Sequence, residues 1–226
     1  MKLFLGNKNY SSWSLRGWLV ARLSGAPFKE VFAPLGGVTP NPAYFAFSPS
    51  GLVPCLHDGD TRVWDTLSIA EYLAERYPAM WPADPLARAW ARSITCEMHS
   101  GFGAMRSAMT MCIRERVDVR PWSPAVVQDV ARVTQIWNDS RARFAAAGDF
   151  LCGAFSIADC FYAPVAFRFR TYAVAPDGDA ARYLASLLAH PLLREWEAAA
   201  LAETMIIDAD EPRVVYRDKL AATGRL

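Results

Sequence analysis

The chain has 226 residues, 53% of them hydrophobic, which is enough to bury one large core or two small ones and excludes a disordered chain. Lys and Arg number 24 against 23 Asp and Glu, with no stretch of one sign, so the sequence argues against nucleic acid or an anionic membrane as a partner. The first apolar run is too short for a signal peptide and no later run reaches about 18 residues, so we expect a cytoplasmic protein.

The N-terminal residues predict a strand, a helix and a second strand. Lys2 to Gly6 is a short apolar run, and polar residues up to Tyr10 lead into a helix from Trp13 to Leu23. Phe28 to Phe32 has the composition of a second strand. The crossover in such a unit is right-handed, so the two strands should be parallel.

A proline-rich and glycine-rich loop follows, and then a hairpin. Residues 34 to 49 form mostly loop, with at most a short helix near 43 to 47, and such a loop is a common place for ligand contacts. Val53 to Leu56 and Arg62 to Trp64 flank an Asp-Gly turn signal, which predicts a tight antiparallel hairpin. Pro54 lacks an N–H, so it is tolerated at a strand end or where a ligand needs open backbone.

The hairpin runs directly into a helix that Asp65 or Thr66 caps and that ends near Tyr77. The free N–H groups at such a helix start, with the Thr66 hydroxyl and the Asp65 carboxylate, can hold both charged groups of an amino-acid headgroup. A capping role alone also explains both residues.

Residues 78 to 85 contain three prolines and predict a stiff linker, which places the domains at 1–80 and 86–226. Only helices are expected beyond it, at 124–147, from Ser156 onward and at 191–201, whereas the tail from Asp208 is weakly patterned. Apolar residues at four-residue spacing from Leu86 continue to Met109, so one long helix is expected, bent at two glycines. Ser156 and Asp159 form a capping box.

In their order and spacing these motifs resemble the cytosolic glutathione transferase family, of bacterial and serine type. Its members carry a cis proline after Val, as at Val53-Pro54, and then an acidic residue with Ser or Thr opening the next helix, as at Asp65-Thr66. A similar Ser/Thr-x-x-Asp box opens the core helix of the family's second domain. The resemblance implies a thioredoxin-like N-terminal domain (βαβ-ββα), an all-helical C-terminal domain and glutathione as co-substrate.

The resemblance also implies roles for the binding residues. The residue before Pro54, Val53, pairs its backbone with the cysteinyl part of glutathione, and Asp65 and Thr66 hold the γ-glutamyl end. The ligand of the glycyl carboxylate should lie in the loop at 34 to 49, where we choose no residue.

The resemblance also implies that a hydroxyl or thiol in the loop before the first helix meets the glutathione sulfur. A hydrogen bond to the thiolate and the helix N-terminus lower the pKa of a thiol. This stretch offers Tyr10, Ser11, Ser12 and Ser14. Ser-Ser-Trp-Ser-Leu-Arg is similar to the Ser-Ser-Cys-Ser-Trp-Arg start of the zeta class, whose first serine contacts the thiolate, and this maps to Ser11. Trp13 stands where that class has cysteine, and Ser11 or Ser12 can also be a simple helix cap.

The five cysteines favour no second chemistry. They are odd in number and include no Cys-x-x-Cys pair, which argues against disulfides, a dithiol redox centre or a metal site. None lies before Cys55, so thiol exchange of the omega type lacks its cysteine. We expect all five to be buried small hydrophobic side chains.

Arginines are the candidates for an acidic substrate. Zeta-class enzymes also isomerise maleylacetoacetate with an Arg late in the capped helix, a position that falls on Thr171 here, with Arg168 and Arg170 close by. Arg106 and Arg114 are further candidates, although a solvated helix face explains them as well.

The sequence therefore predicts a glutathione transferase that transfers glutathione to small hydrophobic electrophiles. Two alternatives stay open: an isomerase like maleylacetoacetate isomerase, and a glutathione-fold protein that binds without catalysis. We expect a homodimer, because members of this family pair the first domain of one subunit with the helical domain of the other.

Overall fold

The computed structural model describes residues 1–224, so the last two residues of the expected helical domain lie outside it. The N-terminal part contains a four-stranded sheet in the order β2-β1-β3-β4. β1 (Lys2–Leu5) pairs in parallel with β2 (Lys29–Phe32), whereas β3 (Cys55–Asp58) runs antiparallel to β1 and to β4 (Thr61–Val63). This is the expected βαβ-ββα arrangement, and the parallel start is confirmed.

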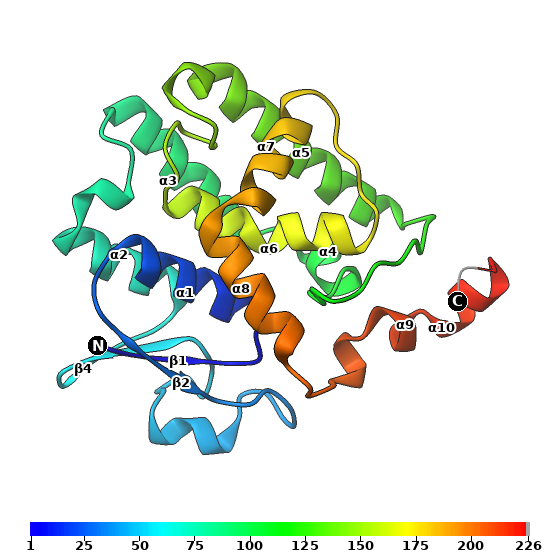
Figure 1. Ribbon diagram of the computed structural model, residues 1–226, viewed down its shortest axis with the longest axis horizontal. Coiled ribbons are helices and arrows are strands. Elements are labelled where there is room, and N and C mark those ends of the chain that lie inside the picture. The colour runs from blue at the N-terminus through cyan, green and yellow to red at the C-terminus, as the bar shows by residue number, and fades with distance from the viewer. Residues whose placement is uncertain (225–226) are drawn as a thin grey trace.

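Two helices cover one face of this sheet, and a short helix lies on the other side (Figure 1). α1 (Ser12–Leu23) and α2 (Thr66–Arg76) pack over the sheet, and the 3₁₀ helix η1 (Pro42–Ala46) lies within the proline-rich loop. β3 begins at Cys55, two residues later than the apolar run suggested. Pro54 precedes it and has no N–H to offer the ladder.

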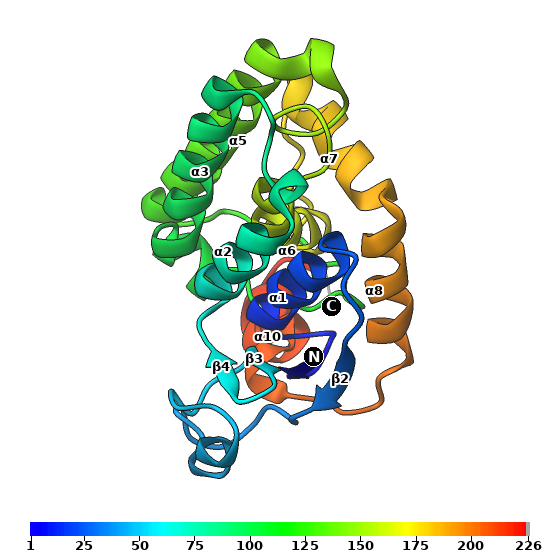
Figure 2. The same cartoon turned by 90° about the vertical axis from the view of Figure 1, so that its left-hand side faces the viewer.

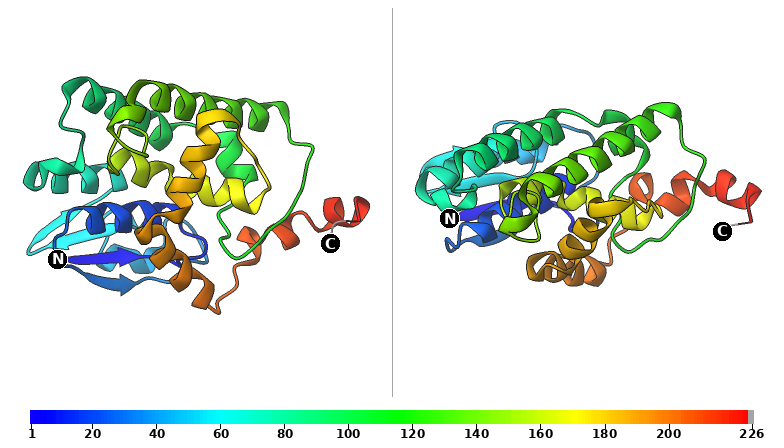
Figure 3. Two further views of the ribbon diagram at one scale, coloured as in Figure 1. Left: turned by 45° about the horizontal axis from the view of Figure 1, so that its top comes forward. Right: turned by 90° about the horizontal axis from the view of Figure 1, so that it is seen from above.

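The remaining chain is helical (Figure 2). Its helices are α3 (Pro85–Ser100), α4 (Gly103–Ala108), α5 (Pro124–Phe144), α6 (Ile157–Thr171), α7 (Gly178–Ala189), α8 (Pro191–Ala202), α9 (Pro212–Val215) and α10 (Arg217–Ala222). Single 3₁₀ turns occur at Pro78–Met80, Ala145–Ala147 and Asp208–Asp210. Figure 3 shows α9 and α10 extending away from the helical body. No helix within residues 1–224 is long and apolar enough to cross a membrane.

The expectation of one long helix from Leu86 to Met109 is wrong. α3 ends at Ser100, and Phe102 takes a left-handed conformation with φ 60° before α4 begins. A Cβ on Gly101 would lie 2.7 Å from the carbonyl oxygen of Glu97, so the chain turns where only glycine fits. The apolar spacing persists across this break, because both helices bury residues in the same core.

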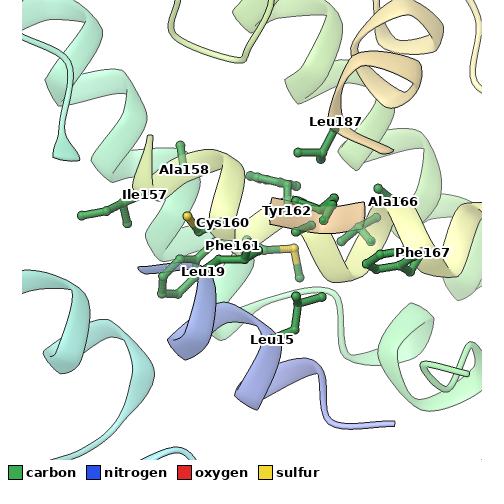
Figure 4. Packing of buried hydrophobic residues seen from close by; sticks show 14 of the residues in the cluster. Leu15, Leu19, Ile157, Ala158, Cys160, Phe161, Tyr162, Ala166, Phe167 and Leu187 are labelled. Atoms are coloured by element: carbon green, nitrogen blue, oxygen red, sulfur yellow. The ribbon is translucent and has the colours of Figure 1, made fainter. Parts of the chain in front are cut away.

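α6 lies at the centre of the helical domain and joins it to the sheet domain. Figure 4 shows Leu15 and Leu19 of α1 beside Phe161 and Cys160 of α6, and all four side chains are fully buried. This contact fixes the orientation of α1, whose N-terminus carries the candidate catalytic residues.

The capping box at the start of α6 is confirmed, and its carboxylate has further partners. Asp159 Oδ2 accepts the backbone N–H of Ser156 at 2.9 Å, and Asp159 Oδ1 accepts the N–H of Leu151 and the hydroxyl of Tyr183. Complete burial raises the pKa of Asp159 to about 6.

The cysteines follow the expectation with one exception. Cys55, Cys112, Cys152 and Cys160 are buried, whereas Cys96 is exposed. Burial raises the pKa of the Cys55 thiol, in agreement with its expected inert character. Cys96 lies on the outer face of α3, where the helix turns it away from the core.

Candidate active site

A cavity of about 220 Å³ lies where the loop before α1 meets the proline-rich loop and the segment before β3. Its lining includes three residues predicted for catalysis and one predicted for binding: Tyr10, Ser11, Ser12 and Val53. The proline-rich loop closes it with Leu35, Gly36, Val38, Thr39, Asn41 and Tyr44. The fold thus brings these separate stretches together at one place.

Ser11 is the N-cap of α1. Its Oγ accepts the N–H of Ser14 at 3.2 Å and donates its hydrogen to Ser14 Oγ at 2.8 Å. Ser14 Oγ in turn accepts the N–H of Gly6 at 2.9 Å, which ties the cap to the end of β1. The capping role foreseen for this serine is present, and its hydroxyl can leave Ser14 Oγ by rotation about one bond.

Ser12 has a different environment. Its hydroxyl makes no hydrogen bond to any of residues 1–224, nor do the N–H groups of Ser12 and Trp13 in the first turn of α1. Free N–H groups at a helix start attract negative charge. The cavity therefore receives a helix N-terminus and two serines, of which Ser12 has the unbonded hydroxyl.

The Tyr10 hydroxyl is already bonded to another residue, which disfavours a contact with a thiolate. Its hydroxyl donates to Oε1 of Glu211 at 2.5 Å, and burial together with this hydrogen bond raises the pKa of Tyr10 to about 12. A phenol bound to a carboxylate is a weaker candidate for contacting a thiolate than either serine.

Val53 has an open backbone. The Val53–Pro54 bond is cis, as expected, and the main-chain N–H and C=O of Val53 bond to no residue within 1–224. Pro54 is buried behind it against α1, where a Cβ on Gly17 would lie 2.8 Å from Pro54 Cγ. Gly17 therefore lets α1 approach Pro54, and Val53 lines the same cavity as Ser11.

Asp65 and Thr66 lie at the start of α2. Asp65 is the N-cap, because Oδ1 accepts the N–H of Leu67 at 3.0 Å, and its Oδ2 lies 3.1 Å from Nε2 of His99. Thr66 is fully buried, and its Oγ1 has no hydrogen-bond partner in the described chain. A buried hydroxyl without a partner is costly, which points to a ligand for it.

Neither Asp65 nor Thr66 lines the cavity itself. His99 of α3 lies between Asp65 and the cavity wall, because its ring contacts Trp13 edge-on with ring centres 5.4 Å apart. Trp13 forms part of the cavity wall. Asp65 is thus separated from the cavity by two packed rings.

Two arginines flank Trp13. The guanidinium carbons of Arg16 and Arg106 lie 4.6 and 4.7 Å from the centre of its ring. Arg16 is fully buried, and its Nη1 and Nη2 have no partner in residues 1–224. Burial, with Arg168 and Arg106 nearby, lowers the pKa of Arg16 well below its usual value.

The other arginine candidates have protein partners. Arg168 donates from Nε to the carbonyl oxygen of Met109 at 2.6 Å, and burial lowers its pKa to about 10. Arg170 Nη1 pairs with Oε1 of Glu197 on α8 at 2.6 Å. Arg106 bonds weakly to the carbonyls of His99 and Gly101, at 3.3 and 3.4 Å. Arg106 therefore has the most freedom to bind a substrate, and Arg170 has a structural ion pair.

No motif in the sequence pointed to Arg16, His99, Glu203 or Glu211 as residues near this site. From the sequence alone Arg16 resembles a solvated helix residue. In the structure its Nε donates to the carbonyl oxygen of Phe161 at 2.9 Å, a contact that no residue near Arg16 in the sequence indicates. Glu203 and Glu211 come from the tail, some 190 to 200 residues from the loop that they contact.

Comparisons with known proteins agree on one family. The model for the glutathione S-transferase N-terminal domain matches residues 10–76, and that for the C-terminal domain matches residues 120–199. Maleylacetoacetate isomerase of Pseudomonas aeruginosa is 30% identical over 218 residues, covering 90% of this chain and 99% of that protein.

Solved structures have the same fold. A glutathione transferase homologue from Burkholderia with bound glutathione matches 89% of this chain and 98% of its own with a TM-score of 0.66 at 20% identity. Maleyl pyruvate isomerase, a bacterial zeta-class enzyme, matches 91% of this chain and 100% of its own with a TM-score of 0.63 at 19% identity. A theta-class transferase from Xanthomonas axonopodis with glutathione bound matches 90% of this chain and 98% of its own with a TM-score of 0.62 at 22% identity.

Proposed function

The chain belongs to the glutathione S-transferase family, and we propose that it binds glutathione in the cavity beside α1 and transfers its activated thiol to small hydrophobic electrophiles. The observation that carries this proposal is that a serine-bearing helix N-terminus and the residue Val53, whose backbone is unpaired within residues 1–224, line one cavity. Two of the structural relatives contain bound glutathione, which supports the ligand.

The proposed binding residues contact glutathione at three of its parts: the cysteinyl backbone, the γ-glutamyl end and the glycyl carboxylate. The free N–H and C=O of Val53 pair with the cysteinyl backbone, as a neighbouring strand would. Asp65 and Thr66 lie outside the cavity, beyond Trp13 and His99, so the γ-glutamyl end extends past Trp13 to reach them. There Asp65 accepts from the γ-glutamyl ammonium, and the unpartnered Thr66 hydroxyl donates to the γ-glutamyl carboxylate. Thr39 and Asn41 line the cavity end formed by the proline-rich loop and serve the glycyl carboxylate.

Thiol activation falls to Ser11, with Ser12 as its rival. The Ser11 hydroxyl turns from Ser14 Oγ to the sulfur, so that it donates to the thiolate while still accepting the Ser14 N–H. The first-turn N–H groups of α1 add the positive end of the helix. Together these favour the thiolate, whose proton leaves to water. The thiolate then attacks the electrophilic carbon, a C–S bond forms, and the leaving group, such as the halide of an aryl halide, departs with the electron pair of the bond that breaks.

A second candidate function is the isomerisation of an acidic substrate. Arg16, Arg106 and Arg168 influence one another electrostatically, and Arg16 forms no ion pair within residues 1–224. A substrate carboxylate beside Trp13 would pair with these arginines and offset their mutual repulsion. The relative named maleylacetoacetate isomerase supports this candidate.

Retention on immobilised glutathione, followed by a conjugation assay with a chromogenic aryl halide, tests the transferase. We expect both retention and turnover. Retention without turnover on any electrophile supports a binding protein, and turnover of a cis-unsaturated diketo acid without net loss of glutathione supports the isomerase. A homodimer is part of the proposal, and light scattering at micromolar concentration checks it.

A further inference from the structure

The C-terminal strap, residues 203–211, lies against the loop that carries the proposed catalytic serines. It follows α8, and the sequence pattern is weak from Asp208 onward. The loop is residues 7–10, between β1 and α1. Hydrogen bonds connect the strap to all four residues of the loop. This is a dense set of contacts for a segment with so little regular structure.

Glu203 holds the first half of the loop. Its Oε1 accepts the N–H of Lys8 at 2.6 Å, and its Oε2 accepts the N–H of Asn9 at 3.1 Å. One carboxylate thus fixes two consecutive peptide groups. The Glu203 carbonyl oxygen accepts from Nη2 of Arg114 at 3.1 Å, so the acid is itself anchored to the helical domain.

Glu211 holds the second half. It is only 7% exposed, and Oε1 accepts the Tyr10 hydroxyl at 2.5 Å while Oε2 lies 3.7 Å from the Cys112 thiol, which donates to it. Tyr10 is also 5% exposed and immediately precedes Ser11. Fixing the Tyr10 side chain therefore fixes the backbone from which Ser11 starts.

The loop is held from other sides as well. The carbonyl oxygen of Asn7 accepts the N–H groups of Tyr10 and Ser11, at 3.2 and 2.8 Å, which closes a tight turn. Asn7 Oδ1 accepts the N–H of Leu35, and Asn9 Oδ1 accepts that of Arg114. The strap supplies the two acidic contacts in this set.

We infer that Glu203 and Glu211 are positioning residues, which set the place of Ser11 at the cavity by holding the loop before it. The inference rests on the proposed function. Neither side chain lines the cavity, so both act through the loop. A change at either residue should reduce thiolate formation and turnover more than glutathione binding, because Val53, Asp65 and Thr66 stay in place.

The test compares Glu203→Gln, Glu211→Ala and Glu211→Gln with the wild type. A glutamine at 203 can accept only one of the two N–H groups, whereas a glutamine at 211 can still accept from Tyr10. Asp208→Asn is the matched control, because Asp208 is an exposed acid of the same strap whose side chain makes no bond to residues 1–224.

For Glu203→Gln and Glu211→Ala we expect kcat to fall about tenfold and the thiol pKa of bound glutathione to rise by about one unit, with the Kd for glutathione changed less than about threefold. Glu211→Gln should recover most of the activity, and Asp208→Asn should match the wild type. Amide hydrogen exchange at residues 7 to 12 should be faster in the two impaired variants.

The outcomes separate the two claims. If wild-type protein does not lower the thiol pKa of bound glutathione, the proposed function fails. If wild-type protein does lower it and the impaired variants keep that pKa, kcat and loop exchange while losing only thermal stability, the strap has a merely structural role and the inference is overturned.

Discussion

Replacing Ser11 by glycine separates its capping role from its proposed contact with sulfur. Serine and glycine are both accepted at an N-cap and differ there by only a few tenths of a kcal/mol, whereas alanine costs about 1 kcal/mol. Ser11→Gly therefore removes the hydroxyl and largely preserves α1. Ser11→Ala removes both, and should lower Tm by a further 2–4 °C or so in a chain of this size.

The expected change in thiol pKa follows from the hydrogen bonds of Ser11. On forming the thiolate contact its hydroxyl gives up the 2.8 Å bond to Ser14 Oγ. A neutral hydrogen bond contributes about 0.5–1.5 kcal/mol, and one to a charged acceptor about 1.5–3 kcal/mol. The net gain is then roughly 1–1.5 kcal/mol, which corresponds to a rise of about one pKa unit in bound glutathione when Ser11 is lost.

The assay is a thiolate absorbance titration of the glutathione complex with Ser11→Gly, Ser11→Ala, Ser12→Ala and Tyr10→Phe. We expect the same rise in both Ser11 variants, with glutathione affinity nearly unchanged. Ser12→Ala should leave the pKa within a few tenths of the wild type. An unchanged pKa in Ser11→Gly together with a rise in Ser12→Ala refutes the assignment and gives the role to Ser12, whose hydroxyl is free of other bonds.

Three further predictions concern other parts of the chain. Thr66→Val should raise the Michaelis constant for glutathione about tenfold at constant kcat in steady-state kinetics, since it removes a ground-state contact. It should also raise the Tm of the ligand-free protein in thermal melts, because the Thr66 hydroxyl is buried without a partner in the described chain. Arg106→Met should raise the Michaelis constant for acidic electrophiles by about tenfold and leave that for a neutral aryl halide unchanged, and equal effects on both would exclude a carboxylate contact. Asp159 has a pKa raised from 3.8 to about 6, so its burial disfavours the charged form and the native state gains stability as the pH falls from 6 towards 4. Relative to Asp159→Asn, the free energy of unfolding of the wild type should therefore rise by roughly 2–3 kcal/mol between pH 7 and pH 4 in denaturant titrations, and a parallel pH profile in the two proteins would contradict this.

Local signals in the sequence predicted most of the fold. The capping box joins Ser156 and Asp159, three positions apart, and the Asp58-Gly59 turn joins neighbouring strands, so a short stretch of sequence is enough to predict each. The break after α3 was missed because the apolar spacing continues through Phe102, whose left-handed backbone gives no signal in the side chain itself. α7 was missed as well, although its buried residues Ala180, Tyr183 and Leu187 follow helical spacing.

In the candidate site, too, residues in local motifs were predicted and residues that depend on contacts distant in the sequence were not. Val53 and Asp65 were predicted as binding residues from motifs, and the backbone of Val53 is unpaired within residues 1–224. The contacts of Glu203 and Glu211 could not be predicted, because they join residues about 195 to 200 positions apart and depend on where α8 ends. For Arg16, burial depends on the packing of α1 on α6, which no pattern within α1 records.

An experimental structure of the glutathione complex tests the central claim most directly. We predict that the cysteinyl N–H and C=O of glutathione pair with the backbone of Val53, and that its sulfur lies within about 3.5 Å of Ser11 Oγ, a usual limit for a hydrogen bond to sulfur with its larger radius. Glutathione found elsewhere on the protein, or bound in the cavity with its sulfur turned away from both Ser11 and Ser12, would contradict the account.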